Sequence, residues 1–213
     1  MDRLTTFFFL RHAEAANPDV YHGAESDVSL GPRGIEQAER VAQFLAEKKI
    51  TRLVSSGMKR ARETALRIAA ACNLEIEIQP RLHERRVGTL SGTVNNLPDG
   101  PWRKTLNRWQ AGEINFAPEG SESFADIRNR VVPIWEDLAA RHAGERVAVV
   151  AHGTVLKVLY LTLLPEWSVS DWDKMGVIPN VGVTEFNGEG KTWKAECLNL
   201  IPPKVLLARP PVD

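Results

Sequence analysis

Apolar and polar residues follow two different periodicities along this chain, one typical of strands and one typical of helices. Residues 5–10 form a short aromatic run that polar residues follow at once, which predicts a strand buried on both faces. Over residues 33–48 the apolar side chains recur at helical spacing, which predicts an amphipathic helix. The same two patterns predict further strands at 51–56, 74–78 and 146–151, and further helices at 58–72 and 154–164.

The order of these elements indicates the fold class. Strands and helices alternate through most of the chain, and a pair of strands near 181–186 and 191–198 follows, joined around the turn sequence NGEG. Such alternation is typical of a mostly parallel sheet with helices on both faces. We therefore predict an α/β protein, a three-layer α/β/α sandwich, in which residues 1–213 form a single domain.

The segment between the third and fourth predicted strands has a different composition. Residues 92–120 are rich in Gly, Pro, Asn and Trp, with one short helix expected near 102–109. We interpret this segment as a lid-like insertion over the active-site edge of the sheet. Ser123 should then cap a long helix, which Pro133 should kink. The proline-containing tail after Ile201 is expected to be an irregular strap.

Composition narrows the possible partners. Lys plus Arg and Asp plus Glu balance at 27 each in 213 residues, so no overall field attracts nucleic acid or an anionic membrane. The two cysteines, Cys72 and Cys197, form no metal-type or redox pair, which favours a reduced, cytoplasmic protein. We expect no signal peptide and no membrane span. The strand pair near 181–198 offers a surface on which a homodimer could form.

Candidate chemistry gathers where the predicted strands end. Arg11 and His12 follow the first strand, and Arg60 lies near the helix start after the second. Glu84 follows the third strand. His152 follows the fourth and directly precedes a helix. Because ligands of open parallel sheets bind at the carboxyl ends of the strands, these side chains should share one site.

The residue types in this site indicate its ligand. Arginines next to histidines repel a metal cation, and no H-E-x-x-H or cysteine pairing is present, so we predict no metal and no cofactor. Arginine forks match the oxygens of a phosphate group, and helix N-termini point N–H groups at the same place. The sequence therefore predicts a site for a small phosphorylated metabolite.

At these residues the chain resembles the histidine phosphatase superfamily, in its phosphoglycerate-mutase-like branch. "LRHAEAAN" is similar to the family's R-H-G-E-x-x-x-N, and "VSSGMKRARETA" to S-S-x-L-x-R-x-x-Q-T-A. "DVSLGPRGIEQA", "LHERRVGTLSG", "EGSESFADIRNRV" and "VVAHGTVLKVL" resemble further blocks in the family's order. The chain departs from the family pattern at four positions, and none of these departures removes a charged group. The four residues are Ala13, Ser29, Gly31 and Ala151.

The resemblance implies a mechanism through phosphohistidine. His12 should attack the phosphorus as a neutral imidazole, while Arg11, Arg60 and His152 neutralise the phosphoryl oxygens. A partly shielded Glu84 should protonate the leaving alkoxide and then take a proton from the attacking water. The residues expected to bind substrate are Arg11, Asn17, Arg60, Arg85 and Gly153.

Other interpretations of these residues stay open at this point. Arg60 could be a solvated helix charge, and Glu84 could pair with Arg85 or Arg86 in a structural salt bridge. His22, His83 and His142 are interpreted as ordinary surface or loop residues. Trp102 and Trp109 could line the pocket or pack against the sheet edge.

Three functions remain in competition. The first is a phosphohydrolase of the histidine acid phosphatase type, acting on a small phosphomonoester. The second is a cofactor-dependent phosphoglycerate mutase, which the short insertion disfavours because it lacks an arginine pair for the substrate carboxylate. The third is a non-catalytic module that binds phosphorylated ligands. The non-catalytic module is disfavoured because the chain retains all five candidate catalytic residues: His12, Arg11, Arg60, Glu84 and His152.

Overall fold

Within residues 4–95, 97–189 and 192–206, which are those the structure describes, the computed structural model contains one six-stranded sheet in the order β3-β2-β4-β1-β5-β6. Neighbouring strands among β1 to β4 are parallel, whereas β5 is antiparallel to both β1 and β6. The strands are β1 (Thr5–Arg11), β2 (Arg52–Ser56), β3 (Ile76–Gln79), β4 (Arg146–Ala151), β5 (Val183–Glu189) and β6 (Thr192–Leu200).

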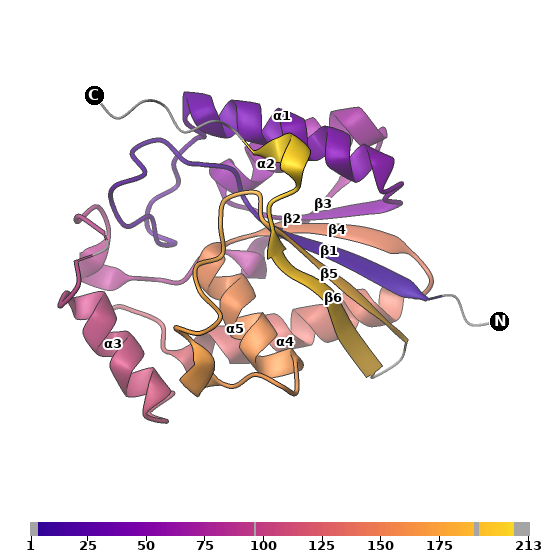
Figure 1. Ribbon diagram of the computed structural model, residues 1–213. Coiled ribbons are helices and arrows are strands. Elements are labelled where there is room, and N and C mark those ends of the chain that lie inside the picture. Colours follow the sequence, from indigo (N-terminus) through magenta and orange to yellow (C-terminus); the bar gives the residue numbers. More distant parts are fainter. Residues whose placement is uncertain (1–3, 96, 190–191, 207–213) are drawn as a thin grey trace.

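Helices cover both faces of this sheet, so the predicted three layers are confirmed (Figure 1). α1 and α2 lie on one face and α4 and α5 on the other, while α3 lies beyond the end of the sheet. The helices are α1 (Pro32–Glu47), α2 (Lys59–Cys72), α3 (Pro101–Gln110), α4 (Phe124–Arg141) and α5 (Gly153–Leu163). Short 3-10 turns also occur, at η1 (Pro80–Leu82), η2 (Gly88–Leu90), η3 (Val169–Asp171) and η4 (Pro203–Val205).

The aromatic run of β1 is explained by its central place in the sheet. Successive side chains of a strand point to opposite faces. Phe7 and Phe9 accordingly pack in the core under α4 and α5, and Phe8 and Leu10 in the core under α1 and α2. All four are at most 2% exposed. A strand buried on both faces is a rigid support for the polar residues that follow it.

Several predicted boundaries shift for local reasons. β3 begins at Ile76 and not at residue 74, because α2 ends through Asn73 in the left-handed region and the Leu74 N–H donates to the Ala69 carbonyl. Ser123 caps α4 as predicted, in a reciprocal capping box with Asp126, and the helix continues through Pro133. The predicted turn over 187–190 and the tail after Ile201 lie partly outside the described residues.

The segment 92–120, apart from residue 96, is held to the body of the protein by aromatic packing. Trp109 of α3 is fully buried, and its indole N–H donates to the Phe116 carbonyl at 2.8 Å. The Trp102 ring meets the ring of Trp172, which follows η3, edge to face at 5.9 Å. Arg103 forms an ion pair with Asp173 at 2.9 Å. These contacts attach α3 beside the carboxyl ends of the parallel strands.

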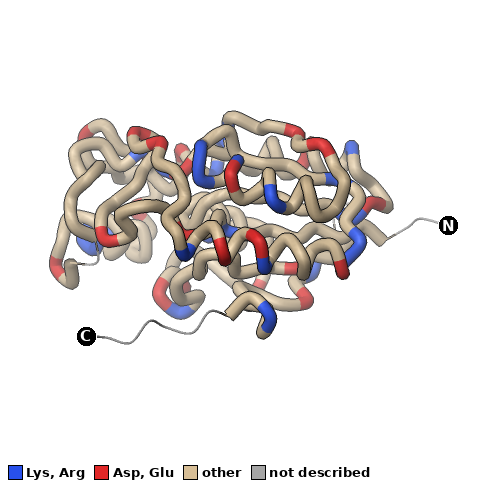
Figure 2. The backbone as a smooth tube through the Cα atoms, turned by 90° about the horizontal axis from the view of Figure 1, so that it is seen from above, with Lys and Arg blue, Asp and Glu red and all other residues tan. Residues whose placement is uncertain are grey.

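Charged residues of both signs are interspersed over the molecule (Figure 2). This agrees with the balanced composition and leaves local clusters as the source of any strong field. No helix in the described part of the chain is long and apolar enough to cross a membrane.

Candidate active site

His12 lies directly after β1 and is 4% exposed. Its Nδ1 is 2.7 Å from the Ala13 carbonyl, so Nδ1 donates there and Nε2 keeps its lone pair. Arg60 Nε donates to that Nε2 at 3.2 Å. Burial, and then the charges of Arg60 and Arg11, hold the pKa of His12 well below its usual value. The imidazole is therefore a neutral base with its free nitrogen facing a cation.

Arg60, in the first turn of α2, is 1% exposed, so the solvated-charge interpretation is wrong. Besides His12, its guanidinium donates to the Ser26 carbonyl at 2.8 Å and to the His22 carbonyl at 3.0 Å. The same side chain thus faces His12 and holds the loop after β1. The Asn180 side chain donates to the His12 carbonyl at 2.9 Å and ties a third segment to this centre.

Arg11 and Gly153 lie against each other at the edge of the pocket. Arg11 Nη1 donates to the Ile178 carbonyl at 2.8 Å, while its buried Nε has no partner among the described residues. A Cβ on Gly153 would lie only 3.4 Å from that Nε, so glycine lets the guanidinium approach the start of α5. The arrangement leaves N–H groups of both residues available to an anion.

His152 ends β4 and is fully buried. Its ring centroid is 5.1 Å from that of His12, so the two histidines do come together. Its Nε2 lies 2.8 Å from Ser56 Oγ, and its buried Nδ1 has no partner within the described chain. Burial and then the charge of Arg60 hold the pKa of His152 well below its usual value. It is not among the residues that line the pocket, and it reaches the site through its contact with the His12 ring.

Glu84 is half-buried and lines the pocket. One carboxylate oxygen accepts the Arg85 N–H at 2.8 Å and the other accepts the Thr154 N–H of α5 at 3.3 Å. Glu84 forms no ion pair with Arg85 or Arg86 among the described residues, so its carboxylate is free of a structural salt bridge. The Arg130 guanidinium, paired with Glu122, donates to the Glu84 carbonyl and fixes this loop.

The structure places two of the predicted substrate-binding residues, Arg85 and Asn17, in different surroundings. Arg85 lines the pocket and is 1% exposed, with its guanidinium 4.5 Å from the Trp102 ring centre. Asn17 is exposed, has a positive φ of 53° and is not among the lining residues. Its backbone carbonyl accepts from His22 instead, so Asn17 shapes the loop that carries His22.

Several residues that line the pocket were not predicted from the sequence to bind substrate, among them His22, Lys157 and Asn180. His22, interpreted as an ordinary loop residue, lines the pocket, and its Nε2 lies 3.0 Å from the Ala16 carbonyl. Lys157 and Asn180 also line it. Lys157 is four residues after Gly153, one helical turn into α5, which is the one signal that could have placed it here.

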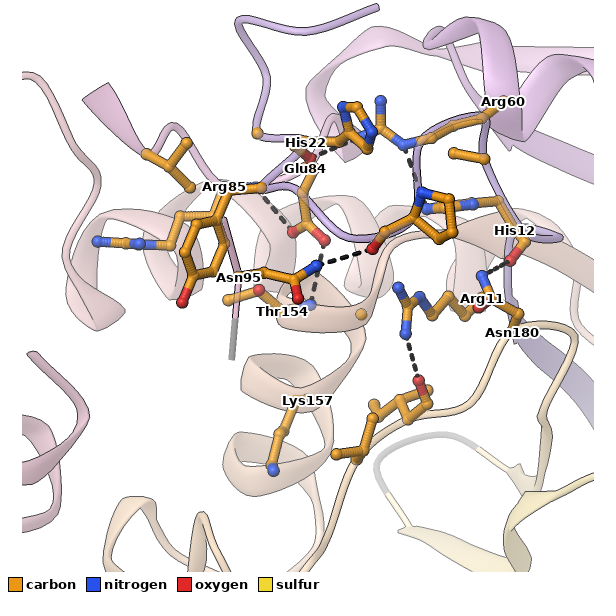
Figure 3. Close-up of a pocket in the computed structure, with 18 of the residues that line it drawn as sticks. Arg11, His12, His22, Arg60, Glu84, Arg85, Asn95, Thr154, Lys157 and Asn180 are labelled. Carbon is orange, nitrogen blue, oxygen red and sulfur yellow. Dashed lines mark hydrogen bonds between the residues drawn. The ribbon is translucent and has the colours of Figure 1, made fainter. Parts of the chain in front are cut away.

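These side chains surround a pocket of about 300 Å³ (Figure 3). Arg11, His12 and Arg60 lie on one side, Arg85 extends away on the other side, Lys157 lies below, and Glu84 lies between Arg85 and Arg60. The set joins a neutral imidazole, several cations and two carboxylates, Glu84 and Glu14. It suits the transfer of a phosphoryl group from an ester to the imidazole.

The fold and this site together define a known class of enzymes. The sequence model of the histidine phosphatase superfamily (branch 1) matches residues 7–201, and the chain belongs to this superfamily. The chain is 29% identical to the metal-independent phosphoserine phosphatase of Arabidopsis thaliana, over 88% of this chain and 90% of that protein. It is 34% identical to phosphoglycerate mutase-like protein 4 of the same organism, over 86% and 80%.

A solved structure extends the likeness to three dimensions. Phosphoserine phosphatase from Entamoeba histolytica, in complex with 3-phosphoglyceric acid, superposes with a TM-score of 0.81 at 25% identity. The match covers 95% of this chain and all of that chain (100%). The predicted resemblance and the predicted α/β fold are thereby confirmed.

Proposed function

We propose that this protein is a phosphohydrolase that removes the phosphoryl group of a small phosphomonoester through a phosphohistidine at His12. The observation that carries the proposal is the buried, neutral His12, whose Nε2 faces Arg60 at 3.2 Å beside Arg11. A phosphoryl group that replaces the Arg60–His12 hydrogen bond would find the nucleophile and a cation together. The superfamily membership and the phosphatase relatives support the same reaction.

In the first step the Nε2 lone pair forms a bond to phosphorus and the ester P–O bond breaks. Arg11, Arg60 and the unpartnered Nδ1 of His152 are the groups that would take the charge of the phosphoryl oxygens. Glu84, across the pocket, donates its proton to the departing alkoxide. The alcohol then leaves, and the phosphoryl group stays on His12.

In the second step water attacks the phosphohistidine. Glu84, now a carboxylate, takes a proton from the water as the new P–O bond forms and the P–N bond breaks. Inorganic phosphate leaves, and both His12 and Glu84 return to their starting states. The backbone N–H groups of Arg85 and Thr154 hold the Glu84 carboxyl group in place through both steps.

The test is to trap the covalent intermediate with a ³²P-labelled phosphomonoester. Label should attach to His12 and be released in acid but not in base. A His12→Ala variant should lose both label and turnover, whereas His142→Ala, at the far end of α4, should keep both. Full turnover in His12→Ala, or label on another residue, would contradict the mechanism.

A mutase is the second candidate, because several relatives are named phosphoglycerate mutase-like or probable phosphoglycerate mutase. The proposed preference for hydrolysis depends on water reaching the phosphohistidine through the pocket mouth. The two activities are separated by measuring phosphate release and the interconversion of 3- and 2-phosphoglycerate on the same sample. Interconversion faster than release would replace our proposal.

We further propose a cytoplasmic location. Both cysteines are free in the described part of the chain and lie on α2 and β6, which suits a reducing compartment. The homodimer suggested by the final strand pair stays a prediction.

A further inference from the structure

The backbone of residues 12–14 is held by side chains that come from three other segments of the chain. The peptide group between His12 and Ala13 is held at both ends. Asn180 donates to its carbonyl at 2.9 Å, as Figure 3 shows, and its N–H donates to Thr64 Oγ1 of α2 at 3.1 Å. Thr64 is fully buried and donates in turn to the Arg60 carbonyl at 2.8 Å. These bonds fix the first peptide group after His12 relative to α2.

The next peptide group, between Ala13 and Glu14, is also held at both ends. Its carbonyl accepts the Nδ1–H of His12 at 2.7 Å, and its N–H donates to Gln37 Oε1 at 2.8 Å. Gln37 is on α1, is 8% exposed and is not among the residues that line the pocket. The imidazole, the peptide group and the Gln37 amide therefore form one chain of hydrogen bonds that runs from the pocket into the protein.

The start of α1 is built to bring Gln37 to this backbone. The Gly31 N–H donates to the Glu14 carbonyl at 3.0 Å, so the helix begins on the same segment. A Cβ on Gly34 would collide with that carbonyl oxygen, so only glycine lets the helix pass this close. Gln37 follows three residues later on the same face of the helix, where its side chain reaches the Glu14 N–H.

The bond to Gln37 also determines where the Ala13 carbonyl points. A peptide group is planar, so the N–H of Glu14 and the carbonyl of Ala13 turn together. Without the Gln37 oxygen, the part-buried N–H would lose its partner, and the peptide group would be free to turn toward another acceptor. The carbonyl would then turn away from the His12 ring.

On the basis of the proposed function, we propose that Gln37 is a positioning residue for the reaction at His12. By accepting the Glu14 N–H it fixes the Ala13 carbonyl, and this carbonyl holds the imidazole with its proton on Nδ1 and with Nε2 directed at the phosphorus. In the free protein Arg60 also donates to Nε2, but a bound phosphoryl group takes the place of that bond. The Ala13 carbonyl is then the hydrogen-bond partner that still orients the ring.

The same chain of hydrogen bonds favours the first chemical step. As Nε2 gives its lone pair to phosphorus, positive charge develops on the imidazole. The Nδ1–H then donates more strongly to the Ala13 carbonyl, and hydrogen bonds in a chain polarise one another. An oriented dipole that meets the developing charge lowers the barrier and does not strengthen the binding of substrate. Loss of Gln37 should therefore lower kcat and leave KM nearly unchanged.

The first test is steady-state hydrolysis of p-nitrophenyl phosphate by Gln37 variants. Gln37→Met keeps the size of the side chain and removes the acceptor, so kcat should fall by about tenfold to a hundredfold. KM should stay within about twofold, because the arginines that bind the phosphoryl group are untouched. Gln37→Glu keeps an acceptor oxygen and should restore kcat to within about threefold of wild type.

Gln43→Met is the matched control, since Gln43 lies on the same helix but is exposed. It should keep the wild-type kcat. A wild-type kcat in Gln37→Met would overturn the inference and leave the phosphohydrolase intact. A Gln37→Glu variant as slow as Gln37→Met would also overturn it, because the acceptor would then not be what matters.

The second test observes the ring proton of His12 directly, by NMR of protein labelled with ¹⁵N-histidine. In the wild type the proton should be on Nδ1 and protected from exchange with solvent, and the signal should be absent in His12→Ala. In Gln37→Met it should shift upfield and exchange faster, which a general loss of helix stability does not predict. A wild-type proton on Nε2, or a slow Gln37→Met with an unchanged Nδ1 signal, would overturn the inference. Failure of the wild type to hydrolyse p-nitrophenyl phosphate would refute the proposed function instead.

Discussion

The two walls of the pocket are built in different ways. On the His12 side, the polar groups follow directly from the ends of the central strands β1 and β4, and their neighbours are backbone carbonyls and other site residues. On the Lys157 side, the cations rest on tryptophan rings that come from α3 and from the segment after η3. The first wall is attached to the sheet, and the second depends on packing between segments outside it.

We expect this difference to separate the reaction from the recognition of the substrate. Transfer of a phosphoryl group requires fixed positions, and residues at the ends of buried strands have little freedom to move. Recognition of the rest of the substrate can vary as the connecting segments vary, because loops tolerate changes that a core does not. Changes on the His12 side should therefore affect kcat for every ester, and changes on the other side should affect the choice of ester.

The largest effect is expected from Arg60→Met. Its side chain faces His12 Nε2 and would face the phosphoryl oxygens, so kcat/KM should fall about a thousandfold for every phosphomonoester. Arg62→Met, two residues along α2 and exposed, should stay within about twofold of wild type. Steady-state phosphate release with several esters measures both. A loss confined to phosphoserine would mean that the two walls are not separate in function.

The two buried histidines should make stability depend on pH. Their pKa values are lowered on folding, so below pH 6.5 the unfolded chain binds protons that the folded chain does not. The free energy of unfolding should therefore be at its full value above that pH. Below pH 6.5, the free energy of unfolding should fall by up to about 1.4 kcal/mol per pH unit for each of the two histidines.

Urea unfolding between pH 7.5 and 5 measures this dependence. A His152→Gln variant should show a shallower slope, because one of the two groups is gone. Because His12 stays neutral, kcat/KM should also lack an acid limb with a midpoint near the usual histidine value of 6.5. An activity loss centred there would show that His12 takes up a proton in the folded protein.

A smaller effect is expected from Trp102→Leu on the second wall. The change removes the aromatic face under Arg85 and the edge contact with Trp172. KM for phosphoserine should rise by about threefold to tenfold with kcat nearly constant, as expected from the loss of one cation–π contact. Initial-rate kinetics separate the two constants. A fall in kcat with unchanged KM would assign Trp102 to the reaction itself.

The smallest effect is expected from Ser123→Ala. Ser123 caps α4 next to Glu122, whose carbonyl accepts from Arg85 Nε. Loss of the cap should lower the free energy of unfolding by about 1 kcal/mol, measured in urea. KM for phosphoserine should be unchanged, because Glu122 remains paired with Arg130. A changed KM would show that the second wall is more sensitive to the start of α4 than its contacts indicate.

The sequence by itself determined the sheet, its helices and the group of residues on the His12 side of the pocket, where we propose that the reaction takes place. Local periodicity predicts each strand, and the carboxyl ends of parallel strands meet at one edge. Their positions along the chain therefore suffice to group Arg11, His12, Arg60, Glu84 and His152. The resemblance to the family's motifs then suggested a role for each of these five residues. Asn17, predicted to bind substrate, is exposed and does not line the pocket, and its left-handed backbone conformation is not visible in the sequence pattern.

Only the tertiary structure placed Lys157 and Trp172 in the second wall and brought the Trp102 ring to Arg85. Lys157 looks like any residue of an apolar helix, and its burial over Trp172 follows from the packing of η3 against α5. The fold of residues 97–120 brings the ring of Trp102 to Arg85, and the sequence of this segment has no regular pattern of apolar residues that would predict the contact. Contacts between segments far apart in the chain leave no local pattern, and such contacts hold the two cations that face the pocket.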